Sequence, residues 1–188
     1  MLKELKNFMK NSFKVAFGGI ICALSATLMF CSSILPFTQY AIPVFTGIAL
    51  VAVVIELGKT WAWIAFAAVS LVCLLIVPNK EPVALYILFF GYYPILKSLF
   101  ESSGNFILEW LLKLVVFNAA MIAFFYAGLY LIGIKPEEYS LFGVNLPIVF
   151  LIAGNILFVV YDILLSRTIV IYIHKIHPYF KKMFKTDK

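Results

Sequence analysis

The chain has 188 residues, 64% of them hydrophobic, and a formal net charge of +6. This length and composition exclude a soluble enzyme module beside the hydrophobic segments. The positive charge does not indicate nucleic-acid binding, because the Lys and Arg residues collect at the ends of the hydrophobic segments, as in membrane proteins.

Six hydrophobic segments follow one another along the chain. Most are long enough, at about 1.5 Å per helical residue, to cross a hydrocarbon core of about 30 Å. We predict spans at about 15–35, 41–57, 60–77, 83–97, 110–134 and 147–165. The expected fold is an all-α, integral membrane bundle of six helices in a single domain over 1–188. The amphipathic, basic ends at 1–14 and 167–188 are suited to the membrane interface.

The positive residues predict the orientation of these spans. If the N-terminus is cytoplasmic, 13 of the 15 Lys and Arg residues fall on the inner side. Only Lys80 and Lys135 then lie outside, as the positive-inside rule expects. We therefore predict that both termini are cytoplasmic.

Polar residues in three outer connections form the first candidate site. These connections are bounded by prolines, and they could converge over the mouth of the bundle to bind a polar small molecule. Ordinary solvated loops are the alternative. The candidate binding residues are Gln39, Tyr40, Asn79, Lys80, Glu81 and Asn145.

Ionisable residues at the inner ends of the spans form a second candidate group: Glu56, Lys97, Asp162 and Arg167. Such groups are costly at membrane depth and usually face the bundle interior. A salt bridge between Glu56 and Lys97, with Glu101 or Lys113 nearby, is the structural interpretation. Asp162 could pair with Arg167 or reach Lys97 or Lys113. A proton relay or coupling cluster is the functional interpretation.

The sequence contains no catalytic or cofactor motif. His174 and His177 lie in the basic tail without an acidic ligand at helical spacing, so we expect no metal site. Nucleotide-binding glycine loops and the HExxH motif are absent. We therefore predict that the protein is not an enzyme and carries no cofactor.

Small residues recur every four positions along the first span. Gly18, Cys22 and Ala26 form one row, and Gly19, Ala23 and Thr27 form another. Such rows let a second helix approach closely within a membrane. The partner is either another helix of this chain or another membrane protein.

With this pattern, the chain resembles the substrate-binding S components of energy-coupling factor (ECF) transporters, which import vitamins. The resemblance covers the length, the six spans, both inner termini and a basic N-terminal helix that leads into a row of small residues. The stretch from Phe90 to Lys97 is also similar to one in related uncharacterised small bacterial membrane proteins. The resemblance implies a multi-pass protein of the bacterial plasma membrane. It also implies that Gly19, Ala23, Ala26 and Thr27 dock onto a coupling subunit.

The leading hypothesis is therefore a membrane subunit that captures a vitamin or similar micronutrient. Partner ATPases would supply the energy through the coupling subunit, and the other contacts would be with membrane lipids. One alternative is a membrane scaffold or assembly protein without a ligand. Another is a self-contained channel or proton-coupled carrier that uses Glu56, Lys97 and Asp162.

Overall fold

The computed structural model describes the backbone of residues 2–34, 38–132, 140–141 and 144–183. Side chains are described for residues 12–34, 38–102, 104–130 and 151–180. The described chain is helical apart from two strands of two residues each. It forms two compact units: the first unit contains 1–86 and 90–95, and the second contains 87–89 and 96–188.

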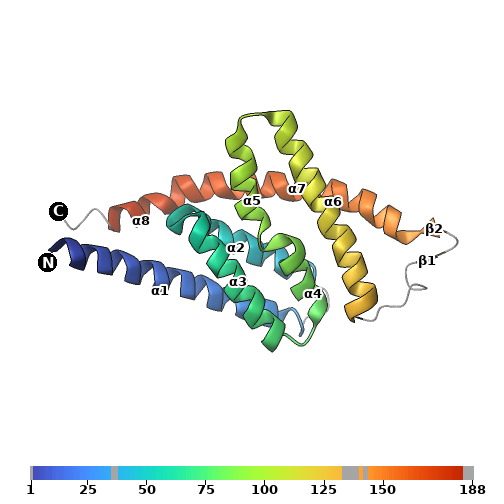
Figure 1. The fold of residues 1–188 in the computed structure, drawn as a ribbon, viewed down its shortest axis with the longest axis horizontal. Helices are drawn as coiled ribbons and strands as arrows, with labels where there is room; N and C mark the ends of the chain where they lie inside the picture. Colours follow the sequence, from blue (N-terminus) through green and yellow to red (C-terminus); the bar gives the residue numbers. More distant parts are fainter. Residues whose placement is uncertain (1, 35–37, 133–139, 142–143, 184–188) are drawn as a thin grey trace. The chain divides into compact units, whose positions relative to one another are not determined.

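The first unit is a three-helix bundle with a short fourth helix. Its helices are α1 (Leu2–Cys31), α2 (Ala41–Leu57), α3 (Lys59–Ile76) and α4 (Lys80–Leu85). Helices α1, α2 and α3 all pack against one another (Figure 1). Their core contains Leu50, Val53, Ala62, Ala65 and Ile95, all buried. The bundle is held by small and branched side chains at helical spacing, which allow close approach.

Two residues set the turns between these helices. Gly58 has φ of 90°, which only glycine adopts at low cost, and it connects α2 directly to α3. Asn79 begins α4, because its side chain accepts a hydrogen bond from the backbone N–H of Glu81.

The fourth hydrophobic segment, Lys80–Phe100, is an interrupted helix. It continues from α4 through the π-helical turn η2 (Tyr86–Phe90) into α5 (Tyr93–Phe100). Within η2, the Gly91 N–H donates to the carbonyl of Tyr86, five residues earlier, at 2.8 Å. Pro94 follows this turn, and a proline within a helical segment removes a backbone donor and favours such an interruption.

The second unit is built on two long helices, α6 (Phe106–Ala127) and α7 (Leu146–Ile171). The shorter elements are η3 (Glu101–Ser103), η4 (Gly128–Ile132), β1 (Ser140–Leu141), β2 (Val144–Asn145), η6 (Tyr172–Ile176) and α8 (His177–Met183). Strands β1 and β2 pair antiparallel.

Aromatic rings fill the core of the second unit. The rings of Phe117 and Phe158 stack with centroids 4.7 Å apart, and Phe89 meets Phe117 edge-on at 5.3 Å. Helix α6 starts at an Asn105 cap, whose side chain accepts from the N–H groups of Ile107 and Leu108.

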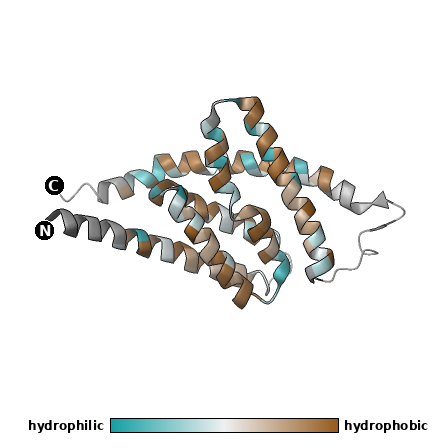
Figure 2. Ribbon diagram, viewed as in Figure 1, coloured by the Kyte–Doolittle hydropathy of each residue, from teal (hydrophilic) through white to brown (hydrophobic). Residues whose placement is uncertain are grey.

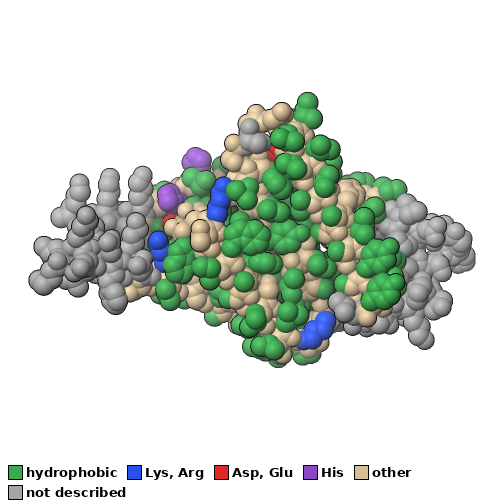
Figure 3. All heavy atoms as spheres, viewed as in Figure 1, with side chains coloured by type: hydrophobic (Ala, Val, Ile, Leu, Met, Phe, Trp, Pro, Cys, Tyr) green, Lys and Arg blue, Asp and Glu red, His purple; other side chains and the backbone are tan. Residues whose placement is uncertain are grey.

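Five helical segments in the described residues are long and apolar enough to cross a membrane: Ser12–Cys31, Lys59–Ile76, Lys80–Phe100, Phe106–Tyr130 and Leu151–Phe180. Hydrophobic residues run along most of their length (Figure 2), and hydrophobic side chains dominate the face shown in Figure 3. The remaining predicted span, 41–57, corresponds to α2, which has 17 residues and is about 26 Å long. Apart from the short β1–β2 pair, the prediction of an all-helical protein is confirmed for the described residues, and five of its helical segments have the length and composition that a membrane span requires.

The amphipathic N-terminal stretch and the first predicted span form one helix. Helix α1 runs without a break from Leu2 to Cys31. No proline or glycine lies between Leu2 and Phe17, so nothing in that stretch ends the helix.

Candidate functional site

Four of the six predicted binding residues hydrogen-bond to one another in the first unit. The Tyr40 hydroxyl donates to Glu81 Oε1 at 2.8 Å. The Asn79 side-chain amide donates to Gln39 Oε1 at 3.3 Å. These two bonds join the α1–α2 connection to the α3–α4 connection. We call Gln39, Tyr40, Asn79 and Glu81 the outer polar group.

Lys80 has a different role from the other predicted binding residues. Its ammonium donates to the carbonyl oxygens of Leu74 and Val77, at 2.7 and 2.8 Å. These carbonyls belong to the last turn of α3 and to the residue that follows it, and they lack partners within the helix. Lys80 therefore caps α3, as basic side chains commonly do at helix C-termini.

Asn145, the sixth predicted binding residue, lies in β2 of the second unit. Its side chain lies outside the described residues. The other five all belong to the first unit. The outer polar group supplies amide, phenol and carboxylate groups, which suit a polar organic ligand better than a metal ion.

Five charged side chains meet in the second unit, and we call Lys97, Glu101, Glu109, Lys113 and Asp162 the ionic cluster. Lys97 Nζ lies 2.6 Å from both Asp162 Oδ1 and Glu101 Oε1. Lys113 Nζ lies 2.6 Å from Glu109 Oε1, and 3.1 Å from both Glu101 Oε1 and Asp162 Oδ2. Asp162 thus bridges the two lysines, one with each carboxylate oxygen.

The three central members of this cluster are buried. Lys97 is 0% exposed, Lys113 1% and Asp162 3%. An isolated charge in such a position would be costly, but each of these groups has at least two partners of opposite charge. Glu101 and Glu109 are more exposed and complete the pairing at its edge. The cluster fastens α5, η3, α6 and α7 of this unit together.

The other two residues of the predicted inner group lie on α2 and further along α7. Glu56 lies on α2, in the first unit. Arg167 is exposed on α7, five residues beyond Asp162. The sequence interpretation assigned Glu109 no role, although its spacing of four residues from Lys113 on one helix is typical of an ion pair.

The two asparagines within the predicted spans pair with each other. Asn118 on α6 and Asn155 on α7 each donate to the other's side-chain oxygen at 3.0 Å. Each amide also donates to the carbonyl four residues earlier in its own helix, at 2.8 Å. The pair therefore joins two helices and leaves no donor unused, as expected for a structural contact in a membrane.

The two small-residue rows of α1 face different surroundings. A Cβ atom on Gly18 would lie 3.7 Å from Leu57, and the Cys22 thiol lies 3.8 Å from the carbonyl of Ala65 on α3. This row therefore packs inside the unit. A Cβ atom on Gly19 would have no neighbour within 4 Å.

The rest of the second row is open as well, since Ala23 and Thr27 are exposed. Ala26, which belongs to the first row, is half-buried. The Thr27 hydroxyl donates to the carbonyl of Ala23 at 2.9 Å, so this side chain presents its methyl group without an unsatisfied donor. The row is therefore compatible with close approach by another apolar helix.

Within the part of the chain that the structure describes, no group of three or more His, Cys, Asp or Glu residues is arranged to hold a metal ion. His174 Nδ1 lies 2.8 Å from the carbonyl of Val170, one turn earlier. Comparisons with protein-family models, curated proteins and solved structures give no match.

Proposed function

We propose that this protein is the substrate-binding membrane subunit of an uptake system for a vitamin or similar micronutrient. In this proposal the chain crosses a bacterial plasma membrane six times, with α2 as the shortest crossing and both termini in the cytoplasm. Partner ATPases supply the energy through a coupling subunit in the membrane. The protein would then resemble the S components of ECF transporters in architecture.

The outer polar group is the observation that carries this proposal. It brings together an amide pair and a phenol–carboxylate pair from two connections that are distant in sequence. Hydrogen-bonding side chains that converge at one end of a bundle are typical of small-molecule sites. The positive-inside distribution of Lys and Arg supports placing this end outside the cell.

The open row on α1 supports the association with a coupling subunit. Gly19, Ala23 and Thr27 present small side chains on the surface of the unit, while the neighbouring row is used inside it. Helix association in lipid depends on close packing rather than on a hydrophobic driving force, so an open row of small residues favours a helical partner.

The test is purification of the protein from its native membrane, followed by mass spectrometry of co-purified proteins and small molecules. We expect an ATPase, a second membrane protein and a bound organic compound. Gly19→Leu should remove the protein partners, whereas Ile20→Leu, at an exposed neighbouring position, should retain them. Recovery of neither an ATPase nor a membrane partner would contradict the proposal.

A self-contained proton-coupled carrier is the second candidate, because the ionic cluster buries Asp162 between two lysines. Buried acidic groups of this kind occur in proton relays. A carrier should transport in proteoliposomes without partners, and Asp162→Asn should abolish that flux. A scaffold protein would instead retain its protein partners and carry no compound.

A further inference from the structure

The buried polar residues of the two units differ in kind. Among the described residues, those of the second unit include the charged Lys97, Lys113 and Asp162, beside the hydroxyl of the buried Tyr161. In the first unit the buried polar side chains are Ser25, Ser32, Thr46 and Ser70, all of them hydroxyls, and the hydroxyl of the fully buried Tyr86 joins them. The buried polar side chains of the first unit are therefore uncharged.

Two of these hydroxyls are satisfied within their own helices. Ser32 Oγ donates to the carbonyl of Met29 at 2.6 Å, and Thr46 Oγ1 donates to the carbonyl of Ile42 at 2.9 Å. This local bond is the usual solution for a serine or threonine within a helix.

Ser25, Ser70 and Tyr86 do not follow this pattern. Their hydroxyl oxygens are buried and have no hydrogen-bond partner among the described residues. Ser25 and Ser70 do not donate to the preceding turn of their helices, although that carbonyl is in reach of most helical serines. A buried hydroxyl without a partner lowers stability, so three of them in one unit call for an explanation.

The three hydroxyls come from helices that pack together. The contact between the Cys22 thiol and the Ala65 carbonyl shows that these two residues lie at a similar height along α1 and α3. Ser25 lies three residues beyond Cys22, and Ser70 lies five residues beyond Ala65. Since α1 and α3 run in the same direction, these serines differ in height by only about 3 Å.

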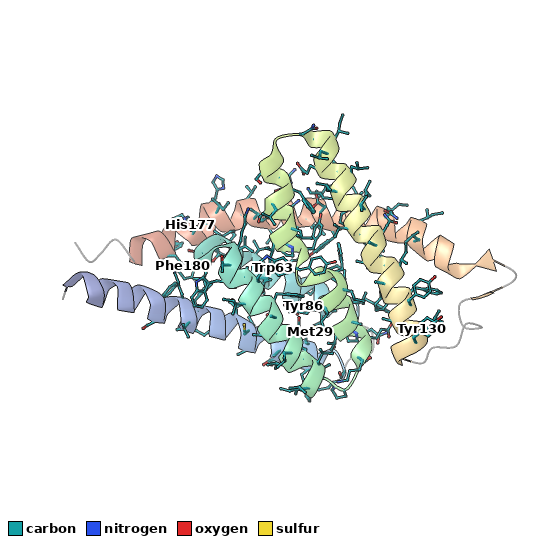
Figure 4. The ribbon with its side chains drawn as sticks, in the orientation of Figure 1. Met29, Trp63, Tyr86, Tyr130, His177 and Phe180 are labelled. Carbon is teal, nitrogen blue, oxygen red and sulfur yellow. The ribbon has the colours of Figure 1, made fainter. Side chains whose placement is uncertain are left out.

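Tyr86 approaches the same interior from η2. Phe66 lies one turn before Ser70 on α3, and the side chain of Tyr86 is fully buried. Its ring packs against Phe66, with centroids 5.8 Å apart, and covers Gly91. Figure 4 marks Tyr86, together with Met29, the residue one turn beyond Ser25 on α1.

We propose that Ser25, Ser70 and Tyr86 form a binding site for a small, uncharged, hydrogen-bonding compound inside the first unit. This inference rests on the proposed function and names the chemical class of its substrate. A charged compound is disfavoured, because the described interior of the unit offers no charged side chain to compensate its burial.

The outer polar group lies toward the same end of α1 as this site. The Asn79 backbone N–H donates to Ser33 Oγ at 3.3 Å, two turns beyond Ser25. In this proposal a compound enters from that end, past the bonds between Tyr40 and Glu81 and between Asn79 and Gln39. The outer polar group then acts as the entrance, and the three hydroxyls act as the site.

The experiment uses the full chain purified in mild detergent, with Ser25→Ala, Ser70→Ala and Tyr86→Phe as variants. Ser32→Ala and Thr46→Ala are matched controls, because they remove buried hydroxyls that are already hydrogen-bonded. Thermal unfolding gives the first readout, and mass spectrometry of the extracted small molecules gives the second.

We expect each site variant to raise the Tm of compound-free protein by about 2–4 °C, since it removes an unpartnered polar group. The controls should leave the Tm unchanged or lower it. We also expect wild type and controls to carry a compound that is uncharged at pH 7, and the site variants to carry at least about tenfold less of it, corresponding to about 1.4 kcal/mol.

Three outcomes would overturn the inference. A lower Tm in the site variants would mean that their hydroxyls are already satisfied. A charged compound would contradict the predicted class. A compound that persists in all three site variants and is lost in Tyr40→Phe would place the site elsewhere and leave the proposed function standing. Recovery of no compound from wild type would overturn both.

Discussion

Asn118 and Asn155 exchange two side-chain hydrogen bonds of 3.0 Å between α6 and α7. In an apolar environment this exchange has a direct consequence, because removal of one amide leaves the other without its partner.

We therefore expect Asn118→Leu to lower the free energy of unfolding by about 1–2 kcal/mol. The double variant Asn118→Leu/Asn155→Leu should recover much of this loss, because it leaves no unpaired amide. Reversible unfolding in mixed detergent micelles measures both values. Thr168→Val is the control, since its hydroxyl bonds only to the carbonyl of Leu164 in its own helix. Additive losses in the double variant would contradict the pairing.

Removal of a charge from the ionic cluster should lower the free energy of unfolding more than removal of one asparagine does. Asp162→Ala would leave two buried lysines side by side without the carboxylate that bridges them, so we expect a loss of about 3–5 kcal/mol. Arg167→Gln, on the same helix but exposed, should change the stability by less than about 0.5 kcal/mol. Thermal unfolding of both variants in detergent distinguishes these expectations, and equal losses would mean that the cluster is not buried as described.

Substitution by alanine should change the stability in opposite directions at two glycines. A Cβ atom at Gly91 would lie 2.7 Å from two ring carbons of Phe66 and 2.8 Å from Tyr86 Cζ, so Gly91→Ala should cost about 1–3 kcal/mol. Gly19→Ala meets no neighbour and should raise the stability by about 0.5–1 kcal/mol, because alanine favours helix. Tm measurements on the purified variants suffice. Tolerance of alanine at Gly91 would show that the rings of Phe66 and Tyr86 can move apart.

A variant of Lys80 distinguishes a helix-capping role of this side chain from a ligand-binding role. Because its ammonium bonds to the carbonyls of Leu74 and Val77, Lys80→Met should lower the stability by about 0.5–1.5 kcal/mol. It should leave the yield of any co-purified compound unchanged. Tyr40→Phe is the comparison, since it removes a bond of the outer polar group without touching α3. Loss of the compound in Lys80→Met with unaltered Tm would assign the ammonium to the ligand instead.

Helix positions followed well from the sequence. The predicted span 41–57 coincides with α2, and 60–77 differs from α3 by one residue at each end. Runs of apolar residues bounded by proline or glycine are a strong local signal. The fourth and fifth helices begin earlier than predicted, at Lys80 and Phe106. Asn79 and Asn105 cap them, and asparagine at a helix start is a signal that the sequence already contained.

Contacts between distant residues were harder to predict. The sequence indicated that Asp162 could reach Lys97 or Lys113, and the structure shows that it bonds to both. That choice depends on which faces of α5, α6 and α7 meet, and hydrophobic periodicity does not specify the faces of helices that are apolar all round. The unpartnered hydroxyls of Ser25 and Ser70 were missed for the same reason.

The bridge formed by Asp162 also bears on biosynthesis. Lys97 and Lys113 leave the ribosome well before Asp162, which follows Lys113 by 49 residues. Until the last long helix arrives, the two lysines have only Glu101 and Glu109 as carboxylate partners, and the carboxylate that bridges them is missing. If these segments cross a membrane, we expect the α5–α6 hairpin to settle fully into it only when α7 joins it.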